Sequence, residues 1–227
     1  MSLVVENVSF AYPGRAPVLR DVSLAVEPGE RVALTAPSGT GKTTLCRVIA
    51  GYLAPAAGRI LLDGVEAGAA PGARRARVGV RLSRHAPRPV QLIWQHPEQA
   101  FDPRLTLAVS LAEGVAGGRR LSRGEARALI ESSELVERFE VRPAWLDRLP
   151  HELSGGELMR LAIVRALLTE PRYLICDEMT ASLDALTQAQ IWRETLALTD
   201  ERGMGLIVVS HSPALLARVS TRAVSLA

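Results

Sequence analysis

Two short motifs that lie far apart in the chain constrain what this sequence can fold into. The first, at residues 36–43, reads Ala-Pro-Ser-Gly-Thr-Gly-Lys-Thr and follows the apolar segment 31–35. The second, at residues 153–157, reads Leu-Ser-Gly-Gly-Glu. A glycine-rich loop between a strand and a helix can turn its backbone N–H groups toward a phosphate, because glycine adopts backbone angles that other residues avoid. The first motif therefore predicts a phosphate-binding P-loop in an α/β domain.

The residue types of this P-loop suit a nucleotide with its magnesium ion. Gly39 and Gly41 let the backbone turn, and the helix that follows offers free N–H groups at its positive dipole end. Lys42 brings charge to the β- and γ-phosphates, and Thr43 offers a hydroxyl to Mg²⁺. The residues predicted to bind the nucleotide here are Ser38, Gly39, Thr40, Gly41, Lys42, Thr43 and Thr44. An ordinary glycine-rich turn before a helix is the alternative.

The loop departs from the usual P-loop pattern at its first position, where the pattern has glycine and this chain has Ala36. Alanine is tolerated at such a position where its φ is negative, and it is costly where φ must be positive. We therefore expect phosphate binding to persist, with an affinity that depends on the backbone angle at Ala36.

Two carboxylates, Asp177 and Glu178, follow the apolar segment 173–176. Adjacent strand residues face opposite ways, but this alternation loosens past the end of a strand. Asp177 is predicted to hold Mg²⁺, directly or through water, and Glu178 to polarise an attacking water. An ordinary charged strand end is the alternative, and the P-loop upstream argues against it.

The second motif also meets the requirements of a helix start, because Ser154 and Glu157 have the spacing of a capping box. The chain contains its own comparison, since residues 121–125 read Leu-Ser-Arg-Gly-Glu and also precede an apolar helix. A helix cap tolerates Arg123, whereas a backbone pressed against a phosphate does not easily tolerate such a side chain. We therefore interpret residues 153–157 as functional and residues 121–125 as structural.

Strand and helix patterns alternate along most of the chain, which implies a mostly parallel sheet. Residues 96–153 have mainly helical patterns and are typical of an insertion in such a domain. Strands are expected at 3–10, 18–26, 31–35, 60–62, 91–95, 173–176, 206–210 and 223–226. Helices are expected at 43–50, 106–115 and 122–138, from 154, from 184 to about 202, and at 213–218.

Composition limits the environment and the partners of the chain. The net charge is a mild +3, and no run of about 18 apolar residues is present to span a bilayer. Cys46 and Cys176 lie in apolar segments, which is typical of buried reduced thiols in a soluble intracellular protein. Residues 65–89 are rich in arginine but contain no aromatic residue for base stacking, so we expect a solvated loop or hairpin and no nucleic-acid partner.

In order and spacing, these motifs resemble the nucleotide-binding subunits of ATP-binding-cassette (ABC) transporters, and the resemblance covers residues 12–211. It implies a P-loop NTPase fold of the ABC ATPase type: an α/β fold with a RecA-like, mostly parallel sheet core, an N-terminal antiparallel β subdomain and an inserted helical subdomain. Residues 1–227 would form one ABC ATPase domain. Residues 1–95 and 154–227 would be the catalytic core with the β subdomain, and residues 96–153 the helical signature subdomain.

The same resemblance assigns further residues. Tyr12 would stack on adenine, and Gln95 would sense Mg²⁺ and water while its loop touches a membrane partner. Residues 182–184, which end at Asp184, would form the loop that crosses between two cassettes, and His211 would contact the γ-phosphate. The catalytic residues would be Lys42, Gln95, Glu178 and His211. The metal ligands would be Thr43, Gln95 and Asp177. The signature residues would be Ser154, Gly155 and Gly156, and they would touch ATP held by a second cassette. Plainer alternatives are a strand-end aromatic for Tyr12, a surface amide for Gln95 and a helix cap for Asp184.

Within the family, residues 94–97 and 101–104 look closest to importers of peptides and nickel, although Met179 stands where the family usually has proline. The resemblance implies an ATPase that uses ATP and Mg²⁺ and is bound peripherally at the cytoplasmic face of the membrane. Its partners would be a second cassette, in a heterodimer rather than a homodimer, permease subunits and an extracytoplasmic substrate-binding protein. The permease and the binding protein, rather than this chain, would choose the cargo.

Three other functions stay open at this point. A soluble ABC ATPase without transport would act on ribosomes, DNA or protein complexes. A regulatory cassette in an asymmetric pair would bind ATP and hydrolyse it poorly, which Ala36 and Met179 allow. A simple P-loop kinase is the third, and it would not need Ser154, Gly155 and Gly156.

Overall fold

The computed structural model describes residues 2–67, 88–116 and 119–226, and two sheets organise them. The first sheet is antiparallel, with the order β2-β1-β4-β5, and the second is parallel, with the order β6-β7-β8-β3-β9. The strands are β1 (Leu3–Ala11), β2 (Pro17–Val26), β3 (Arg31–Thr35), β4 (Ala57–Leu62), β5 (Val65–Glu66), β6 (Val90–Ile93), β7 (Tyr173–Asp177), β8 (Gly205–Val209) and β9 (Arg222–Ser225). The expected parallel core with an N-terminal antiparallel sheet is thus present.

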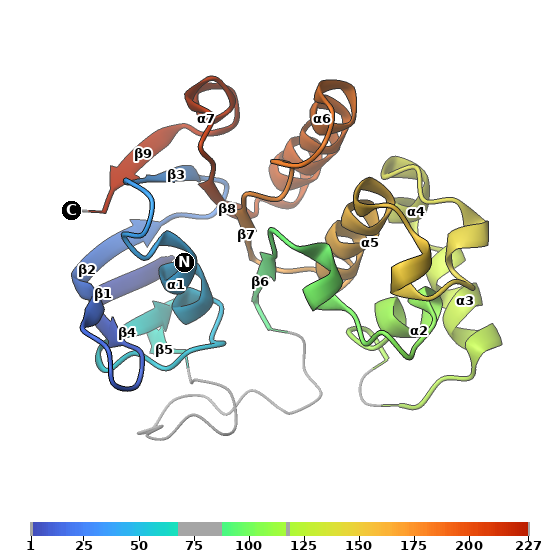
Figure 1. Cartoon of the computed structure of the whole chain (residues 1–227), viewed down its shortest axis with the longest axis horizontal. Helices are drawn as coiled ribbons and strands as arrows, with labels where there is room; N and C mark the ends of the chain where they lie inside the picture. Colours follow the sequence, from blue (N-terminus) through green and yellow to red (C-terminus); the bar gives the residue numbers. More distant parts are fainter. Residues whose placement is uncertain (1, 68–87, 117–118, 227) are drawn as a thin grey trace.

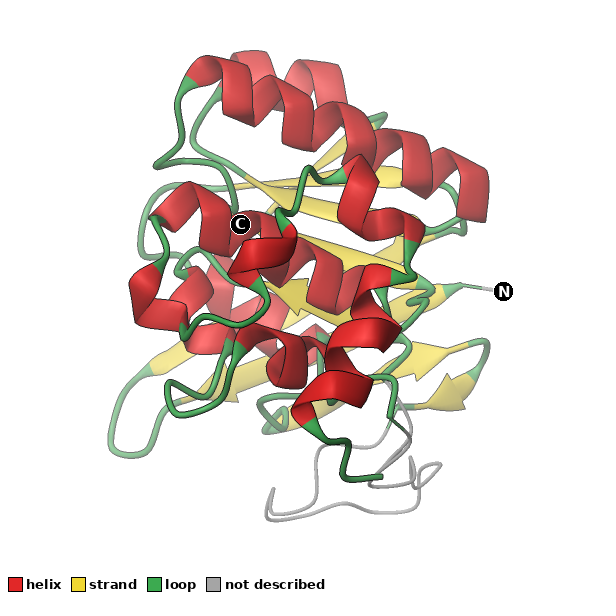
Figure 2. Cartoon of the chain, turned by 90° about the vertical axis from the view of Figure 1, so that its right-hand side faces the viewer, coloured by secondary structure: helices red, strands yellow, loops and turns green. Residues whose placement is uncertain are grey.

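The helices fall into two groups around these sheets. In Figure 1, α2–α5 lie to one side of β6, whereas α1 and both sheets lie on the other side, and Figure 2 views the chain from the side of these helices. The helices are α1 (Lys42–Ile49), α2 (Leu107–Ala112), α3 (Arg123–Glu131), α4 (Glu134–Arg138), α5 (Gly155–Leu167), α6 (Ala185–Arg202) and α7 (Pro213–Val219), and short 3₁₀ turns lie at Pro97–Ala100, Pro143–Trp145 and Pro150–Glu152. Among the helices of the described residues, none is long and apolar enough to cross a membrane.

The single helix expected at residues 122–138 is wrong, because the chain forms α3 and α4 with a break at Ser132 and Ser133. Ser133 is the N-cap of α4, and its hydroxyl accepts a hydrogen bond from the backbone N–H of Leu135 at 3.3 Å. A serine that satisfies the N–H groups of a new helix competes with continuation of the old one. The apolar spacing alone did not reveal this competition.

The parallel sheet is covered on both faces, and β7 and β8 are buried along their whole length. This explains why their sequences are continuous apolar runs rather than alternating ones. One face, with Ile175 and Val209, packs in a buried cluster with α1 and the antiparallel sheet. The other face, with Leu174 and Val208, belongs to a cluster that continues through α5 and α6 into the inserted helices. The helices between β6 and α5 therefore share one core with the parallel sheet.

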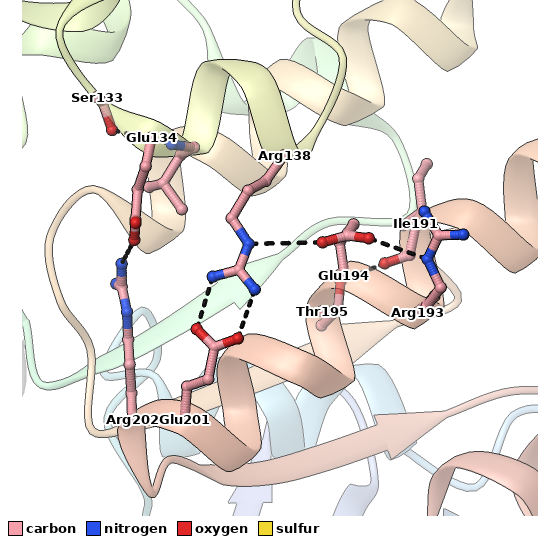
Figure 3. A network of polar contacts seen from close by, with 10 residues as sticks. Ser133, Glu134, Arg138, Ile191, Arg193, Glu194, Thr195, Glu201 and Arg202 are labelled. Carbon is pink, nitrogen blue, oxygen red and sulfur yellow. Dashed lines mark hydrogen bonds and ion pairs between the residues drawn. The ribbon is translucent and has the colours of Figure 1, made fainter.

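A set of ion pairs, which we name the α4–α6 network, also ties the insertion to α6 (Figure 3). The Arg138 guanidinium donates to both carboxylate oxygens of Glu201, at 2.6 and 2.5 Å, and lies 3.5 Å from Glu194. The network consists of Glu134, Arg138, Glu194, Glu201 and Arg202. Its charges join two elements that are far apart in sequence, so the orientation of the insertion is fixed by polar as well as apolar contacts.

Candidate functional site

The loop between β3 and α1 has the backbone that a phosphate site needs. Gly39 and Gly41 have φ values of 82° and 97°, in the left-handed region that favours glycine. A Cβ added at Gly41 would lie 2.8 Å from Cγ1 of Val18 and 2.9 Å from Cδ2 of Leu19. Both the backbone angle and the close approach of β2 therefore require glycine at position 41.

Ala36 and Lys42 lie across the start of the same loop. Ala36 is not among the non-glycine residues of the described chain that have positive φ, so alanine is tolerated there without backbone strain. The Lys42 ammonium donates to the carbonyl oxygens of Ala36 and Pro37, at 2.6 and 3.0 Å, and only 8% of the residue is exposed. A positive charge is thus held at the mouth of the loop.

Asp177 lies at the end of β7, is 4% exposed, and its Oδ1 has no hydrogen-bond partner among the described residues. Burial raises the pKa of its carboxyl, against a hydrogen bond from the Thr43 hydroxyl that lowers it. A buried carboxylate oxygen without a partner is costly unless a cation completes its surroundings. Carboxylate and hydroxyl oxygens are the ligands that Mg²⁺ prefers, so Asp177 and Thr43 fit a magnesium site.

Glu178 receives a partner on each of its carboxylate oxygens. Gln95 Nε2 donates to Oε2 at 3.0 Å, and His211 Nε2 lies 2.8 Å from Oε1. The Glu178 side chain is 15% exposed, and its backbone has a φ of 52°, a left-handed angle that is uncommon for a residue other than glycine. Three residues that the sequence predicted to be catalytic, from three distant parts of the chain, therefore meet at one carboxylate.

The order of the parallel strands explains this meeting. Gln95 follows β6, Glu178 follows β7, His211 follows β8, and the P-loop follows β3. These four strands are neighbours in the sheet and run in the same direction. The carboxyl ends of parallel strands share one edge of the sheet, which is where ligands bind in open α/β sheets. The candidate site is this edge.

Residues 153–157 and 121–125 form the same local structure. Ser154 and Ser122 are both N-caps of complete capping boxes, with Glu157 and Glu125 as the reciprocal partners. A Cβ added at Gly155 would meet no atom within 4 Å. Neither the cap nor the packing within the described chain therefore requires glycine at position 155.

The signature lies near Glu178 of its own chain. A cleft is lined by Gln95, Leu153, Gly155, Glu178 and Ser182, and no P-loop residue is part of that lining. A Cβ at Gly156 would lie 3.5 Å from Cδ2 of Leu183. The signature of this chain therefore faces Gln95 and the segment after Glu178.

The positions of Asp184 and Tyr12 agree with the roles that the family resemblance implies and also with the plainer alternatives, a helix cap for Asp184 and a strand-end aromatic for Tyr12. Asp184 caps α6 by accepting the backbone N–H groups of Leu186 and Thr187, at 3.1 and 3.0 Å, and the hydrogen bonds from Thr187 lower its pKa. The Tyr12 hydroxyl lies 3.3 Å from the Thr44 hydroxyl, which places the ring at the first turn of α1.

Sequence reasoning gave no role to Thr180, which lies two residues after Glu178 and is 2% exposed. Its hydroxyl accepts hydrogen bonds from Gln188 and Trp192 of α6. The sequence does indicate that Gln188 and Trp192 lie on one face of a helix, because they are four residues apart. It does not indicate that Thr180 lies against that face.

Comparison with known proteins agrees with this geometry. The family model described as "ABC transporter" matches residues 19–181. This chain belongs to the ABC transporter family. The family assignment explains why a P-loop, a signature and an acidic strand end occur in one cassette, and the family's cassettes bind ATP. The resemblance and the fold that the sequence predicted are thereby confirmed.

Individual relatives indicate which members of the family this chain is similar to. The cassette is 34% identical to a probable peptide ABC transporter ATP-binding protein, y4tS, of Sinorhizobium fredii, over 97% of this chain and 62% of that protein. It is 32% identical to the nickel import system ATP-binding protein NikE of Staphylococcus aureus, over 98% of this chain and 85% of the relative. The chain thus spans about three fifths of the length of the first relative. The expected similarity to peptide and nickel importers is confirmed.

A solved structure has the same fold. The dimeric ATP-binding cassette MJ0796, in a post-hydrolysis state bound to ADP and Pi, superposes with a TM-score of 0.78 at 25% identity. The superposition covers 99% of this chain and 94% of that one.

Proposed function

We propose that this cassette binds Mg-ATP and hydrolyses it to ADP and phosphate, and that the hydrolysis powers an ABC importer. The observation that carries the proposal is the Glu178 carboxylate, whose two oxygens are held by Gln95 and His211 beside a buried Asp177 and a P-loop. A carboxylate fixed in this way has the chemistry of a general base at a phosphate site.

The P-loop side of the site binds and orients the nucleotide. Backbone N–H groups of residues 38–44 and the charge of Lys42 take the phosphates, and Tyr12 stacks on the adenine. Asp177, Thr43 and Gln95 hold Mg²⁺, which when bound supplies positive charge to the phosphate oxygens. The negative φ of Ala36 supports normal phosphate binding, which argues against a cassette that only regulates.

Glu178 acts on the attacking water. Its carboxylate accepts a proton from that water, while Gln95 and His211 hold its oxygens in place. His211 also contacts the γ-phosphate, so the same imidazole links the base to the phosphoryl group that the water attacks as ADP leaves.

A second cassette completes the site. Ser154, Gly155 and Gly156 touch ATP held by the partner cassette, and Asp184 lies at the crossing between the two. The open space around Gly155 supports such a contact. Residues 96–153 form the helical signature subdomain, and residues 1–95 and 154–227 the catalytic core. The partner is a different cassette, as in a heterodimer.

The cargo is a dipeptide, an oligopeptide or nickel. The support is the similarity to proteins named for peptide transport and nickel import. Permease subunits then form the channel, an extracytoplasmic binding protein delivers the cargo, and this chain lies peripherally at the cytoplasmic face of the membrane.

Replacement of the base tests the proposal. Glu178→Gln is studied in the complex with its co-purifying partners. Its affinity for Mg-ATP is expected to stay within about twofold of wild type, and its hydrolysis rate is expected to fall by a factor of about 100 or more. Phosphate release and equilibrium binding are the measurements. Glu137→Gln, an exposed change on α4, is the matched control and should retain full turnover. Turnover at the wild-type rate in Glu178→Gln would remove Glu178 from the role of base.

A further inference from the structure

Thr180 is a buried acceptor that joins the segment after Glu178 to α6. Its Oγ1 lies 2.8 Å from Nε2 of Gln188 and 3.0 Å from Nε1 of Trp192. A hydroxyl oxygen has two lone pairs, and these two N–H groups take both. Thr180 is 2% and Trp192 5% exposed, so water cannot readily replace either hydrogen bond.

Further hydrogen bonds make the segment from Glu178 to Asp184, which we name the 178–184 loop, a folded unit. The N–H of Ala181 donates to the Glu178 carbonyl at 3.1 Å, and the N–H of Leu183 donates to the Thr180 carbonyl at 3.2 Å. At its end Asp184 caps α6. Because the loop is held together by its own hydrogen bonds, the hydrogen bonds to the Thr180 hydroxyl restrict the position of the whole loop.

Glu178 needs such a tie because its backbone has a left-handed φ of 52°. A non-glycine residue keeps this conformation only where its surroundings over-determine it. Upstream, the N–H of Glu178 donates to the Val209 carbonyl at 3.0 Å, which continues the pairing of β7 with β8. Downstream, the nearest side-chain hydrogen bonds to α6 are those that the Thr180 hydroxyl accepts from Gln188 and Trp192.

We propose that Thr180 is a positioning residue for Glu178, whose hydroxyl fixes the 178–184 loop to Gln188 and Trp192 and so holds the base against Gln95 and His211. The inference rests on the proposed function, in which Glu178 activates water. Thr180 is buried and acts through the backbone of the loop. Loss of its hydroxyl lets the left-handed turn relax, which moves the carboxylate.

Three substitutions isolate the hydroxyl. Thr180→Val keeps the shape of the side chain and removes the acceptor, and Thr180→Ser restores the acceptor. Thr195→Val is the matched control, because Thr195 is also fully buried but its hydroxyl donates within α6, to the Ile191 carbonyl at 2.8 Å (Figure 3). All three are compared in the complex with the partners that co-purify with the chain.

Steady-state kinetics give the first readout. Thr180→Val is expected to lower kcat about tenfold or more, since a small misplacement of a catalytic group is costly, with KM and Mg-ATP affinity within about twofold of wild type. Thr180→Ser and Thr195→Val are expected to retain kcat within about threefold. A purely structural role would instead lower kcat to the same extent in Thr180→Val and Thr195→Val.

The Trp192 indole gives the second readout, by nuclear magnetic resonance of the ¹⁵N-labelled chain. Its N–H signal is expected to shift and to exchange faster with solvent in Thr180→Val, and to stay unchanged in Thr180→Ser and Thr195→Val. If Thr180→Val does not fold, Trp192→Phe removes one donor instead and should lower kcat by a smaller factor at unchanged KM.

The outcomes distinguish failure of the positioning role from failure of the proposed function. Wild-type kcat in a folded Thr180→Val, or in Trp192→Phe where that variant replaces it, overturns the positioning role alone, as does failure of Thr180→Ser to restore kcat. A wild-type complex that hydrolyses no ATP overturns the proposed function and this inference together.

Discussion

At the scale of single residues, Asp177 carries a carboxylate into the protein interior without a full set of partners. Burial raises the pKa of this group, and one of its oxygens has no hydrogen bond from the described residues. Such a group destabilises a fold. In the proposed function, its placement beside Thr43 and the P-loop serves ligand binding rather than stability.

Asp177→Asn separates these two effects, because it removes the charge and keeps the shape. The free energy of unfolding of the nucleotide-free chain is expected to rise by about 1 kcal/mol, as measured by urea denaturation in EDTA. The additional stabilisation that Mg²⁺ gives in the presence of ATP is expected to disappear. The exposed Asp200→Asn is the control, and lower stability with a retained Mg²⁺ effect in Asp177→Asn would contradict the assignment.

At the scale of elements, α3 and α5 begin with the same capping box but differ in the residue that follows the N-cap serine. Both have a capping box, but Arg123 occupies the place in α3 that Gly155 occupies in α5. The space around Gly155 is open within the chain. Helix formation alone therefore does not explain glycine at position 155, and the proposed contact with a second cassette would.

Gly155→Arg gives the signature the sequence of residues 121–125. The variant is expected to fold with a free energy of unfolding within about 0.5 kcal/mol of wild type, because the cap is intact and a Cβ at this position meets no atom within 4 Å. ATP-dependent pairing and hydrolysis are expected to be lost. Circular dichroism and phosphate release are the measurements, with Arg123→Gly as the control. Full hydrolysis in Gly155→Arg would mean that this backbone approaches no phosphate.

The α4–α6 network is expected to stabilise the attachment of the insertion. Arg138→Met should lower the melting temperature by about 3 °C or more at pH 7, whereas Arg193→Met, which removes an exposed guanidinium beside the same Glu194, should change it little. Hydrogen bonding by Arg138 lowers the pKa of Glu201 from 4.5. This stabilisation is therefore present above pH 4.5 and is lost as the pH falls through the lowered pKa.

Thermal unfolding of both variants between pH 7 and pH 3.5 measures this dependence. The difference between wild type and Arg138→Met should shrink in acid. A difference that grows as the pH falls would exclude the ion pairs as its source.

Periodicity in the sequence predicted most of these elements, because buried parallel strands and capped helices have strong local patterns. The start of α6 at Ala185 follows directly from the Asp184 cap. The break between α3 and α4 escaped prediction, since two serines within an amphipathic stretch are compatible with either one helix or two. Local signals predict local structure, and this choice depends on packing.

Family resemblance predicted roles for Gln95 and His211, and the acidic strand end predicted one for Glu178. The order of the parallel strands explains why the three side chains meet. Thr180 could not be predicted, because its partners Gln188 and Trp192 reach it only once α6 is packed on the sheet. The segment 65–89, expected to be a loop or hairpin, lies largely outside the described residues, although β5 pairs with β4 at its start.

At the scale of the whole molecule, one chain contains a P-loop and a signature that lines a cleft to which no P-loop residue contributes. The cassette has the fold of a cassette solved as a dimer. A site completed by a second cassette accounts for both observations, since each chain then supplies the half that the other lacks.

Whether two cassettes share the nucleotide can be decided from the mass of the protein in solution. Glu178→Gln, together with its partner cassette, is measured by light scattering with Mg-ATP and with Mg-ADP. We expect the mass of a pair of cassettes with Mg-ATP and of single cassettes with Mg-ADP. The same mass with both nucleotides would contradict a site completed by a second cassette.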